Sequence, residues 1–254
     1  MWSPVVQLKS WLKDSPAVYD RMKPAKRMLS RSAAYDYLNA LSRSRDGQIS
    51  FIQIGANDGL RNDPIREFVV RDRWRGVLVE PLPDMFAKLK RNYGGRRFSG
   101  LHFENAAVSQ RDDEVLEFWT FRSDFLDALS NERRLYYLRK SSFDRNHVLS
   151  FLENDAEAER ALERIIVPCV TVSRLATRYF DAGEFDLLVI DAEGHEKVIL
   201  DSIDFARVRP RVIFFESEHL GGADDETGAR LRGAGYRVRK ISVQDSVAEL
   251  GAGG

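Results

Sequence analysis

Two almost uninterrupted apolar runs constrain the fold of this chain more than any other feature of its sequence. Residues 185–191 read FDLLVID, and residues 211–216 read RVIFFE. Runs of this kind are typical of strands that are buried on both faces of a parallel sheet. Each run is followed by a segment with the apolar spacing of a helix, at residues 195–203 and 225–234. The sequence therefore predicts an α/β fold.

The same alternation extends over most of the chain. We expect further strands at residues 49–54, 76–80, 101–109, 114–121, 167–172 and 236–243. Helices are predicted to begin at Asn62-Asp63-Pro64, at Pro83 and at Ser173, because caps and an early proline mark helix starts. Strands that alternate with helices predict a mostly parallel, doubly wound sheet. The last strand is expected at residues 236–243.

Two segments interrupt this pattern. Residues 1–45 carry nine Lys and Arg against three Asp, with aromatic residues between them. We expect a helical extension packed on the main domain, with an arm for a membrane surface or an anionic substrate as the alternative. Residues 122–166 are highly charged and helix-prone, and we interpret them as an insertion that forms a lid. The main domain is then expected at residues 46–250.

Composition excludes several classes of protein. Lys plus Arg and Asp plus Glu both total 39 in the 254 residues, so a chain-wide electrostatic grip on DNA is not expected. A single cysteine, Cys169, rules out an intramolecular disulfide and argues against a cysteine-based zinc site. No run approaches the roughly 18 apolar residues of a membrane span. We therefore expect a cytoplasmic protein without a transmembrane segment.

The residues at the carboxyl ends of the predicted strands indicate the ligand. In an open parallel sheet, ligands bind beyond these ends. The residues there are rich in carboxylates and contain no lysine, and they are Gly55, Ala56, Asn57, Asp58, Gly59, Glu80, Pro81, Asn105, Ala106, Asp191, Glu193, His195 and Glu216. Such a set suits a ligand that is cationic and carries hydroxyl groups. S-adenosylmethionine, with a sulfonium, an ammonium and a ribose diol, fits this description.

A dinucleotide is the rival ligand for such a loop. The loop lacks the G-x-G-x-x-G spacing, because Gly55 is followed by Ala56, Asn57 and Asp58. Asp58 is also expected to point a carboxylate towards a pyrophosphate. Glu80, 25 residues after Gly55, is placed to accept hydrogen bonds from both ribose hydroxyls. These features favour S-adenosylmethionine over a dinucleotide.

Several segments together resemble the FkbM family of S-adenosylmethionine-dependent methyltransferases. They are IQIGANDG (52–59), VLVEPLPDMFAKLKRN (77–92), NAAVS (105–109), VPCVTVSRLA (167–176), LLVIDAEGHEKVIL (187–200) and RPRVIFFESE (209–218). The resemblance implies a Rossmann-like methyltransferase fold with a final antiparallel strand. It further implies that Gly55, Ala56 and Asn57 contact the amino-acid portion of the cofactor. Glu80 would then hold the ribose, Asn105 and Ala106 would flank the adenine, and Asp191 and Glu193 would face the transferred methyl group.

Family members are mostly associated with O-methylation of sugars, glycans, lipids and secondary metabolites, so the resemblance implies an acceptor with a hydroxyl group. Such an acceptor benefits from a base. The candidates are Asp191, Glu193, His195 and Glu216. We expect the insertion at 122–166 to select the acceptor, so that its deletion would leave cofactor binding intact and abolish activity.

Other possibilities stay open. The acidic cluster suits Mg²⁺, but its spacing is no metal motif, so a metal is not favoured. DNA and RNA amino-methylation is disfavoured, because no aromatic residue follows Asp191 to stack an extruded base. The basic N-terminus keeps an RNA acceptor as a minor alternative. A non-catalytic module that binds S-adenosylmethionine is the other alternative. The sequence does not indicate an oligomeric state.

Overall fold

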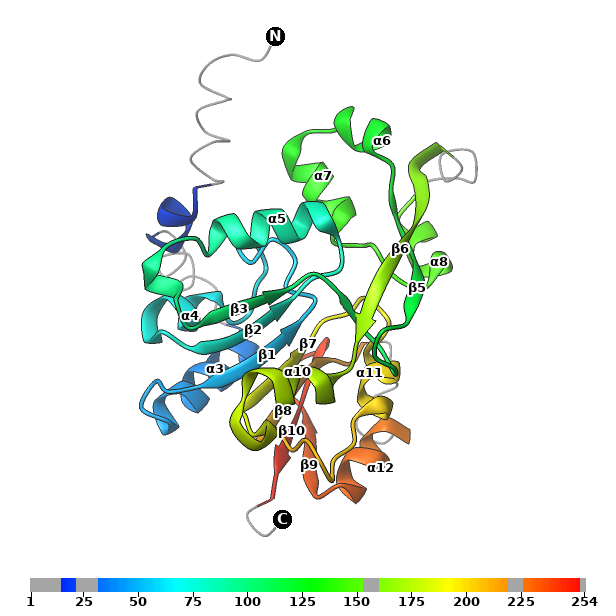
Figure 1. Cartoon of the computed structure of the whole chain (residues 1–254). Helices are drawn as coiled ribbons and strands as arrows, with labels where there is room; N and C mark the ends of the chain where they lie inside the picture. The colour runs from blue at the N-terminus through cyan, green and yellow to red at the C-terminus, as the bar shows by residue number, and fades with distance from the viewer. Residues whose placement is uncertain (1–14, 22–31, 153–159, 219–225, 252–254) are drawn as a thin grey trace.

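A seven-stranded sheet forms the centre of the molecule. The computed structural model describes residues 15–21, 32–152, 160–218 and 226–251 (Figure 1). The strand order is β3-β2-β1-β7-β8-β10-β9, and every strand is parallel to the others except β10. The strands are β1 (Ser50–Ile54), β2 (Arg75–Val79), β3 (Leu101–Glu104), β7 (Leu187–Ile190), β8 (Val212–Glu216), β9 (Tyr236–Lys240) and β10 (Asp245–Leu250). The predicted mostly parallel, doubly wound sheet is confirmed, and the antiparallel strand that the resemblance implied is β10, which lies beyond the predicted last strand.

Helices cover both faces of the sheet, as expected for strands that are apolar at nearly every position. Successive residues of each strand contribute to opposite layers, so Phe51 and Leu187 pack on one side while Ile52 and Leu188 pack on the other. The first layer holds α3 (Ala33–Ser44), α4 (Arg66–Asp72) and α5 (Pro83–Asn92). The second holds α10 (Val172–Tyr179), α11 (Glu196–Ser202) and α12 (Glu226–Gly233). Short 3-10 turns lie at Arg96–Phe98 and Asp181–Gly183.

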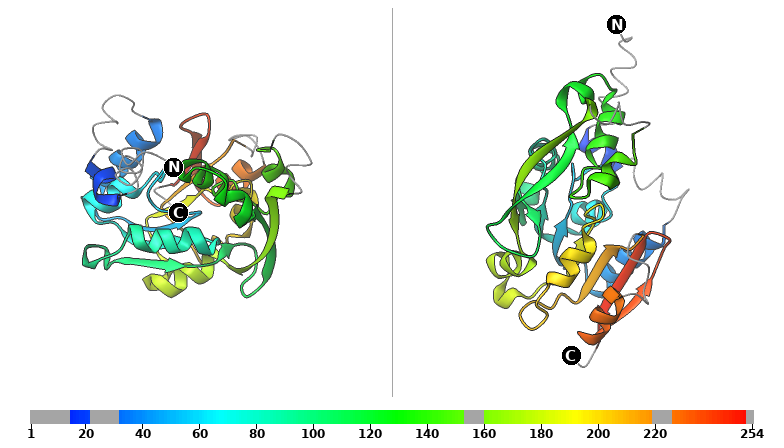
Figure 2. Two further views of the ribbon diagram at one scale, coloured as in Figure 1. Left: turned by 90° about the horizontal axis from the view of Figure 1, so that it is seen from above. Right: turned by 90° about the vertical axis from the view of Figure 1, so that its right-hand side faces the viewer.

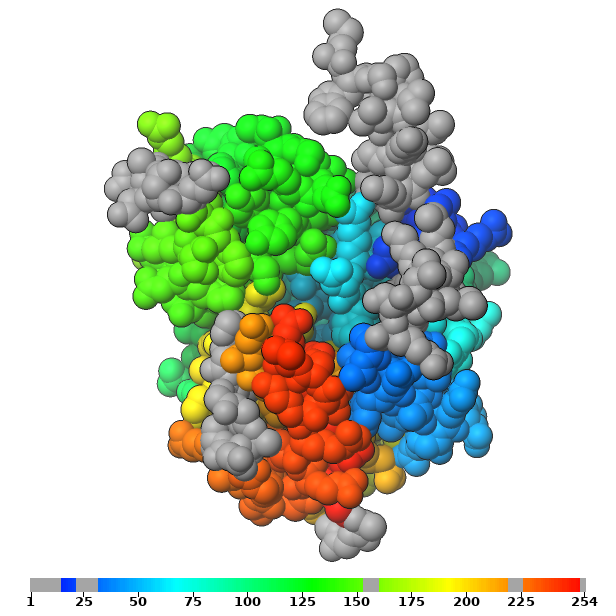
Figure 3. Space-filling view, turned by 180° about the vertical axis from the view of Figure 1, so that it is seen from behind, coloured from blue at the N-terminus to red at the C-terminus, as the bar shows by residue number. Residues whose placement is uncertain are grey.

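A smaller sheet and three short helices stand at the carboxyl ends of the parallel strands (Figures 1 and 2). The order of this sheet is β4-β6-β5, formed by β4 (Ala107–Val108), β5 (Val115–Phe121) and β6 (Leu162–Val170). We call α6 (Ser123–Asp127), α7 (Asn131–Leu138) and α8 (Arg145–Leu149) the lid helices. They share an apolar cluster with β5, β6 and the start of α5. In the space-filling view the lid helices and the strands that they pack on, in green and yellow-green, form a lobe at the top of the molecule (Figure 3).

The described part of the N-terminal segment packs on the main domain. Tyr35 of α3 stacks on Phe68 of α4, with ring centroids 5.3 Å apart. Ser42 donates a hydrogen bond to Asp72 and accepts one from the indole of Trp74. Packed helices were the favoured expectation for this segment, and residues 32–45 agree with it. Residues 1–14 and 22–31 lie outside the described residues, so the predicted boundary at residue 45 and the alternative of a basic arm stay untested.

Several predicted elements differ from the observed ones. The expected strand at 101–109 is two strands in different sheets, because Asn105 turns the chain and donates its amide to the carbonyls of Glu80 and Pro81. The end of the predicted insertion belongs to β6, which begins at Leu162. The helix predicted from Ser173 is capped by Thr171, whose side chain accepts from the Arg174 N–H.

The predicted last strand was also wrong in its extent. Residues 236–243 contain β9, which ends at Lys240, and the chain then turns back as β10 between β8 and β9. β10 reads DSVAEL and has no long apolar run, although its centre is buried. Within the described residues, no helix combines the length and the apolarity that crossing a membrane requires. The cytoplasmic location stays a prediction.

Candidate active site

The loop after β1 brings the chain back against the end of β7. Gly55 has φ of +76°, and a Cβ at this position would lie 1.7 Å from the carbonyl oxygen of Asp191. Only glycine fits there, both for its backbone angle and for this close approach. Asn57 also has positive φ, and its side chain donates to the carbonyl of Gly55 at 3.1 Å. These contacts therefore fix the backbone of the loop directly beside the end of β7.

Glu80 lies at the end of β2 and orders this loop. Its side chain is buried, and its two oxygens accept the N–H groups of Asn57 and Leu82, each at 2.9 Å. Burial raises the pKa of Glu80 to about 7, although the two N–H groups oppose that shift. A carboxylate has about four acceptor positions, so both oxygens can also accept a hydroxyl. Glu80 is thus fit to bind a diol and holds the loop in place.

Three cavities meet at the carboxyl ends of the strands. The first, which we call the Glu80 cavity, leaves about 50 Å³ for the centres of water molecules and is bordered by Gly55, Glu80, Ala106 and His195. The other two are the Lys140 cavity, of about 190 Å³, and the Tyr35 cavity, of about 470 Å³ by the same measure. Asp191 borders all three cavities.

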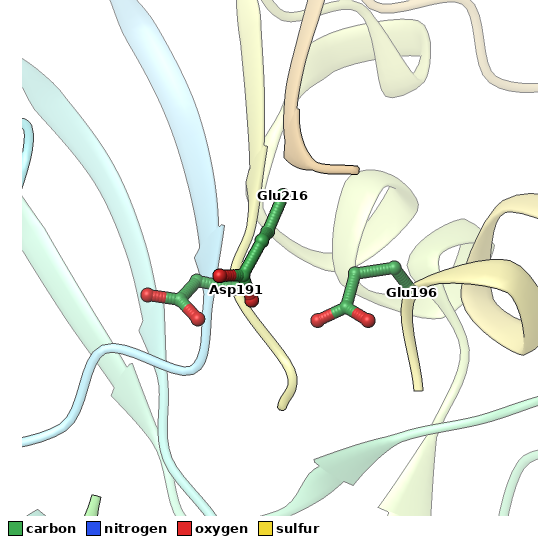
Figure 4. A group of neighbouring side chains, drawn as sticks. All are labelled: Asp191, Glu196 and Glu216. Carbon is green, nitrogen blue, oxygen red and sulfur yellow. The ribbon is translucent and has the colours of Figure 1, made fainter. Parts of the chain in front are cut away.

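Three carboxylates from three elements come together beside these cavities. Asp191 follows β7, Glu216 ends β8 and Glu196 begins α11, and oxygens of all three lie within 4.8 Å of one another (Figure 4). Burial and the neighbouring carboxylates raise the pKa of Asp191 well above its usual range. The same causes raise the pKa of Glu216 to about 7. The group can therefore accept a proton near neutral pH or face a cation.

Glu196 has a second role in this cluster. Its two oxygens accept the N–H groups of Ala192 and Gly194, at 2.6 and 3.0 Å, so its carboxylate shapes the turn after β7. Divalent cations favour carboxylate oxygens, and these three residues are of that kind. The sequence prediction, that Mg²⁺ is possible but not favoured, stays untested.

Glu193 joins the turn after β7 to the segment after α7. Its carboxylate accepts from Lys140 Nζ at 2.9 and 3.0 Å, and His147 Nε2 lies 3.2 Å from one of its oxygens. Ser142 donates to the Glu193 carbonyl at 2.7 Å, and the backbone of Glu193 has a φ of +48°. A left-handed φ is strained for a residue other than glycine. The contacts with Lys140, Ser142 and His147 hold the Glu193 backbone in this conformation. They also attach the segment after α7 to the turn after β7.

His195 lies in the Glu80 cavity and does not line the other two cavities. Its ring packs on Phe143 with centroids 4.3 Å apart, and its buried Nε2 has no hydrogen-bond partner among the described residues. Burial lowers the pKa of His195 to about 4, so the ring is neutral at pH 7. It is thus a half-buried wall of the cavity rather than an exposed residue at a helix start.

The remaining predicted residues divide into two groups. Pro81 and Ala106 line the Glu80 cavity, and Ala56 lines the Lys140 cavity. Asp58 was expected to face a ligand, but its buried carboxylate accepts the N–H groups of Leu60 and Arg61 and so stabilises the loop. Neither Gly59 nor Asn105 lines the Glu80 cavity. A Cβ on Gly59 would meet Leu89 at 2.4 Å, so that glycine allows α5 to pack.

Two further residues belong to the site and were not among the predicted site residues. One is Glu196, which stands three residues after Glu193 in the IDAEGHE motif. An acidic residue at a helix start commonly accepts N–H groups of the preceding turn, and this rule could have identified it. The other is Arg139, which lines both the Glu80 and the Lys140 cavities. No sequence pattern distinguishes Arg139 from the other basic residues of its segment.

The strand order and this site define the chain as an α/β domain of the methyltransferase type. The family model described as the methyltransferase FkbM domain matches residues 53–238, and the chain belongs to this family of S-adenosylmethionine-dependent methyltransferases. Carboxylates line the Glu80 cavity, and this lining fits a cofactor that carries two cationic groups and a diol. No curated protein matches the chain.

Three solved structures show how distant the similar proteins are. A methyltransferase FkbM from Methylobacillus flagellatus KT is 10% identical with a TM-score of 0.45, over 80% of this chain but only 44% of its own. An SAH-bound methyltransferase from Podospora anserina is 13% identical with a TM-score of 0.41, over 97% of this chain and 95% of its own. A precorrin-6y C5,15-methyltransferase from Geobacter metallireducens GS-15 is 13% identical with a TM-score of 0.38, over 80% of each chain. At these identities, no substrate and no residue's role transfers to this protein.

Proposed function

We propose that this protein transfers the methyl group of S-adenosylmethionine to a hydroxyl group of a sugar, glycan, lipid or secondary metabolite. The observation that carries the proposal is the position of Asp191, which lines the Glu80 cavity and also the Lys140 and Tyr35 cavities. A donor in the first cavity and an acceptor in the others would meet at this residue.

The Glu80 cavity is the proposed cofactor site. We expect Gly55 and Asn57 to contact the amino-acid portion, Glu80 to accept the ribose hydroxyls, and Ala106 to lie against the adenine. When bound, the cofactor supplies an electrophilic methyl group on a positively charged sulfur. The carboxylates around the cavity complement that charge, and the lid helices exclude water from it.

The acceptor is expected on the other side of Asp191. The Tyr35 cavity is lined by aromatic, amide and carboxylate side chains, among them Tyr35, Asn62, Gln244 and Asp245. Such groups pack against sugar rings and bond to hydroxyls. Glu216 lines both cavities on this side, and its pKa of about 7 suits a group that takes a proton from a hydroxyl near neutral pH.

Asp191 and Glu216 are therefore the proposed bases, and they are favoured over the two other candidates. Glu193 already pairs with Lys140 and His147. His195 lines only the proposed cofactor cavity, with its ring against Phe143. We assign these two residues to the shape of the site rather than to proton transfer.

The test has a binding stage and a turnover stage. Calorimetric titration with S-adenosylmethionine and S-adenosylhomocysteine should give saturable binding, and no binding at millimolar ligand would refute the proposal. Label from the cofactor methyl group should then appear on a hydroxylated acceptor. The label should resist mild alkali, which releases methyl esters but not methyl ethers. Binding without turnover on any such acceptor would favour a non-catalytic module instead.

A further inference from the structure

Arg139 stands between the proposed cofactor and acceptor cavities with an unused hydrogen-bond donor. It caps the carboxyl end of α7 and lines both the Glu80 and the Lys140 cavities. Its Nη1 is buried and has no hydrogen-bond partner among the described residues. The next residue, Lys140, is by contrast paired with both oxygens of Glu193.

A buried donor without a partner destabilises a folded protein. The cost is about 1–3 kcal/mol for a neutral group and more for a charged one. Such groups are therefore uncommon in folded proteins and call for an explanation. A guanidinium that lines a cavity gains its missing partner when an anionic ligand enters, and its planar fork suits a carboxylate.

The charges around the Glu80 cavity indicate which anionic group this is. Its charged lining residues in the described part of the chain are Glu80, Asp191 and Glu193, with Arg139 as the one Lys or Arg. S-adenosylmethionine carries two positive groups, the sulfonium and the ammonium, and one negative group, the α-carboxylate. Three acidic side chains and one guanidinium complement that distribution of charge.

The position of Arg139 matches the expected orientation of the cofactor. Gly55 and Asn57, the proposed contacts of the amino-acid portion, border the same two cavities as Arg139. Other lining residues of the Glu80 cavity, among them Ala106, Ala107 and Val108, are apolar and suit an adenine ring. The α-carboxylate of the cofactor would then lie near Arg139, among the residues that the Glu80 and Lys140 cavities share.

We propose that Arg139 binds the α-carboxylate of S-adenosylmethionine through charge-assisted hydrogen bonds. This inference rests on the proposed function, because it assumes the cofactor in the Glu80 cavity. It makes the segment after α7 part of the cofactor site. The segment is held in place by the Lys140–Glu193 ion pair and by paired backbone hydrogen bonds between Ser142 and Trp119.

A carboxylate or phosphate on the acceptor is the rival partner, because Arg139 also lines the Lys140 cavity. That cavity already has two other cationic side chains, Arg61 and Lys140. The Glu80 cavity has no other Lys or Arg among its described lining residues, and Ser141 and Phe143 of the same segment also line it. The cofactor carboxylate is therefore the partner with the greater need for Arg139.

The test is a thermodynamic cycle that removes the Arg139 guanidinium from the protein and the α-carboxylate from the ligand, separately and together. Calorimetry would measure Kd for S-adenosylmethionine and for its decarboxylated analogue, with the wild type and with Arg139→Met. For each protein, the ratio of the two Kd values gives the effect of removing the carboxylate from the ligand. We expect this ratio to be about 10- to 100-fold larger for the wild type than for Arg139→Met, which is the range for a lost hydrogen bond between charged groups. Because the analogue also has a higher net positive charge, only the difference between the two proteins is interpreted.

Matched variants separate binding from folding. Arg133→Met changes an exposed arginine of the same helix and should leave both Kd values unchanged. Arg139→Met should melt at or above the wild-type temperature without ligand, because it removes an unpartnered buried donor, and it should lose most of the stabilisation by S-adenosylmethionine. Arg139→Lys retains the charge without the planar fork, so it should fall between the two.

The outcomes distinguish this inference from the proposed function. If Arg139→Met weakens both ligands equally, or neither, the inference is overturned while cofactor binding stands. If the variant binds S-adenosylmethionine normally but has a raised KM for an anionic acceptor, the guanidinium binds the acceptor and the inference is again overturned. If the wild type binds neither ligand, the proposed function itself is refuted.

Discussion

Glu216 is the residue whose protonation should control the rate of the proposed reaction. Burial and the nearby Glu193 and Glu196 carboxylates raise its pKa to about 7. A base must be ionised to accept a proton, so kcat/KM of the wild type should rise with pH through about 7 and then level off. Glu216→Gln should lower kcat by about 100-fold or more and abolish that rise. It should leave the Kd for S-adenosylmethionine within a few-fold of the wild-type value.

The control for this prediction is Glu218→Gln. Glu218 is exposed, lies two residues further along the chain and accepts a hydrogen bond from Gln244. The Glu218→Gln protein should retain both the wild-type rate and the wild-type pH profile. A Glu216→Gln protein that still gains activity through pH 7 would assign the proton transfer to another group, with Asp191 as the first to examine.

Gly55 is the residue at which the loop after β1 tolerates no side chain. The Cβ of Gly55→Ala would lie 1.7 Å from the carbonyl oxygen of Asp191, so β1 and β7 would have to separate. We expect a loss of more than about 3 kcal/mol in the free energy of unfolding, measured by urea titration. Gly95 also has positive φ, at +104°, but nothing lies within 4 Å of its added Cβ. Gly95→Ala should cost only about 1–3 kcal/mol of backbone strain, and equal losses in the two variants would contradict the steric explanation.

At the scale of elements, the lid helices belong to both halves of the site. The sequence led us to expect that deleting residues 122–166 would spare cofactor binding. Leu138, Arg139 and Phe143 line the Glu80 cavity, and residues 162–166 form the first half of β6. Such a deletion would therefore remove walls of the proposed cofactor cavity and unpair β5. We now expect it to impair cofactor binding and folding as well as activity.

A substitution at Lys140 tests the role of the segment after α7 without removing that segment. Lys140→Met breaks the ion pair with Glu193, whose carboxylate retains His147 as a neighbour. Removing one partner of a half-buried ion pair leaves the other charge poorly compensated, so we expect faster hydrogen exchange at residues 139–143 and a Kd for S-adenosylmethionine raised about 3- to 30-fold. Lys90→Met, at an exposed position of α5, is the control and should change neither quantity. Unchanged exchange at residues 139–143 in Lys140→Met would show that the ion pair does not hold the segment.

The elements that the sequence predicted well are those with strong local signals. The apolar runs at β7 and β8 and the stripe of Ile65, Phe68 and Val69 leave few alternatives. The predicted start of that helix was wrong, because α4 begins at Arg66 with Ile65 as its N-cap and not at Asn62-Asp63-Pro64. β10 was missed because its burial comes from insertion between β8 and β9 and not from an apolar run of its own. The division of residues 101–109 into β3 and β4 depends on the long-range hydrogen bonds of Asn105, which no local pattern reveals.

At the scale of the whole molecule, the fold buries or half-buries four carboxyl groups around the site, those of Glu80, Asp191, Glu196 and Glu216. The sequence identified Glu80, Asp191 and Glu216 as strand-end residues, because the ends of parallel strands meet at one edge. It did not identify the contacts that depend on tertiary packing, such as those of Glu196 with the turn after β7 or those of Asp58 within its own loop. Position in the sheet was predictable, whereas the direction in which each side chain points was not.

This concentration of buried carboxyl groups should govern how stability depends on pH. Burial raises the pKa of Glu80 to about 7, and it raises the pKa of Asp191, Glu196 and Glu216 as well. A raised carboxyl pKa means that the folded chain retains protons that the unfolded chain releases. Its contribution to stability is complete below the unfolded pKa of about 4.3 and is lost as the pH rises through about 7. Carboxyls with lowered pKa, such as Asp186, act in the opposite sense and only as the pH falls below about 4.

We therefore expect the ligand-free protein to melt several degrees lower at pH 8 than at pH 5.5. Glu80→Gln should reduce that difference, because the raised pKa of Glu80 lowers the free energy of unfolding by about 2 kcal/mol between these two pH values. A cationic ligand favours the ionised carboxylates, so the rise in melting temperature caused by S-adenosylmethionine should be larger at pH 8 than at pH 5.5. Differential scanning calorimetry at the two pH values, with and without ligand, measures all of these quantities. A melting temperature that increases from pH 5.5 to pH 8 without ligand would mean that these carboxyl groups are ionised and compensated in the folded protein, by cations that the described contacts do not supply.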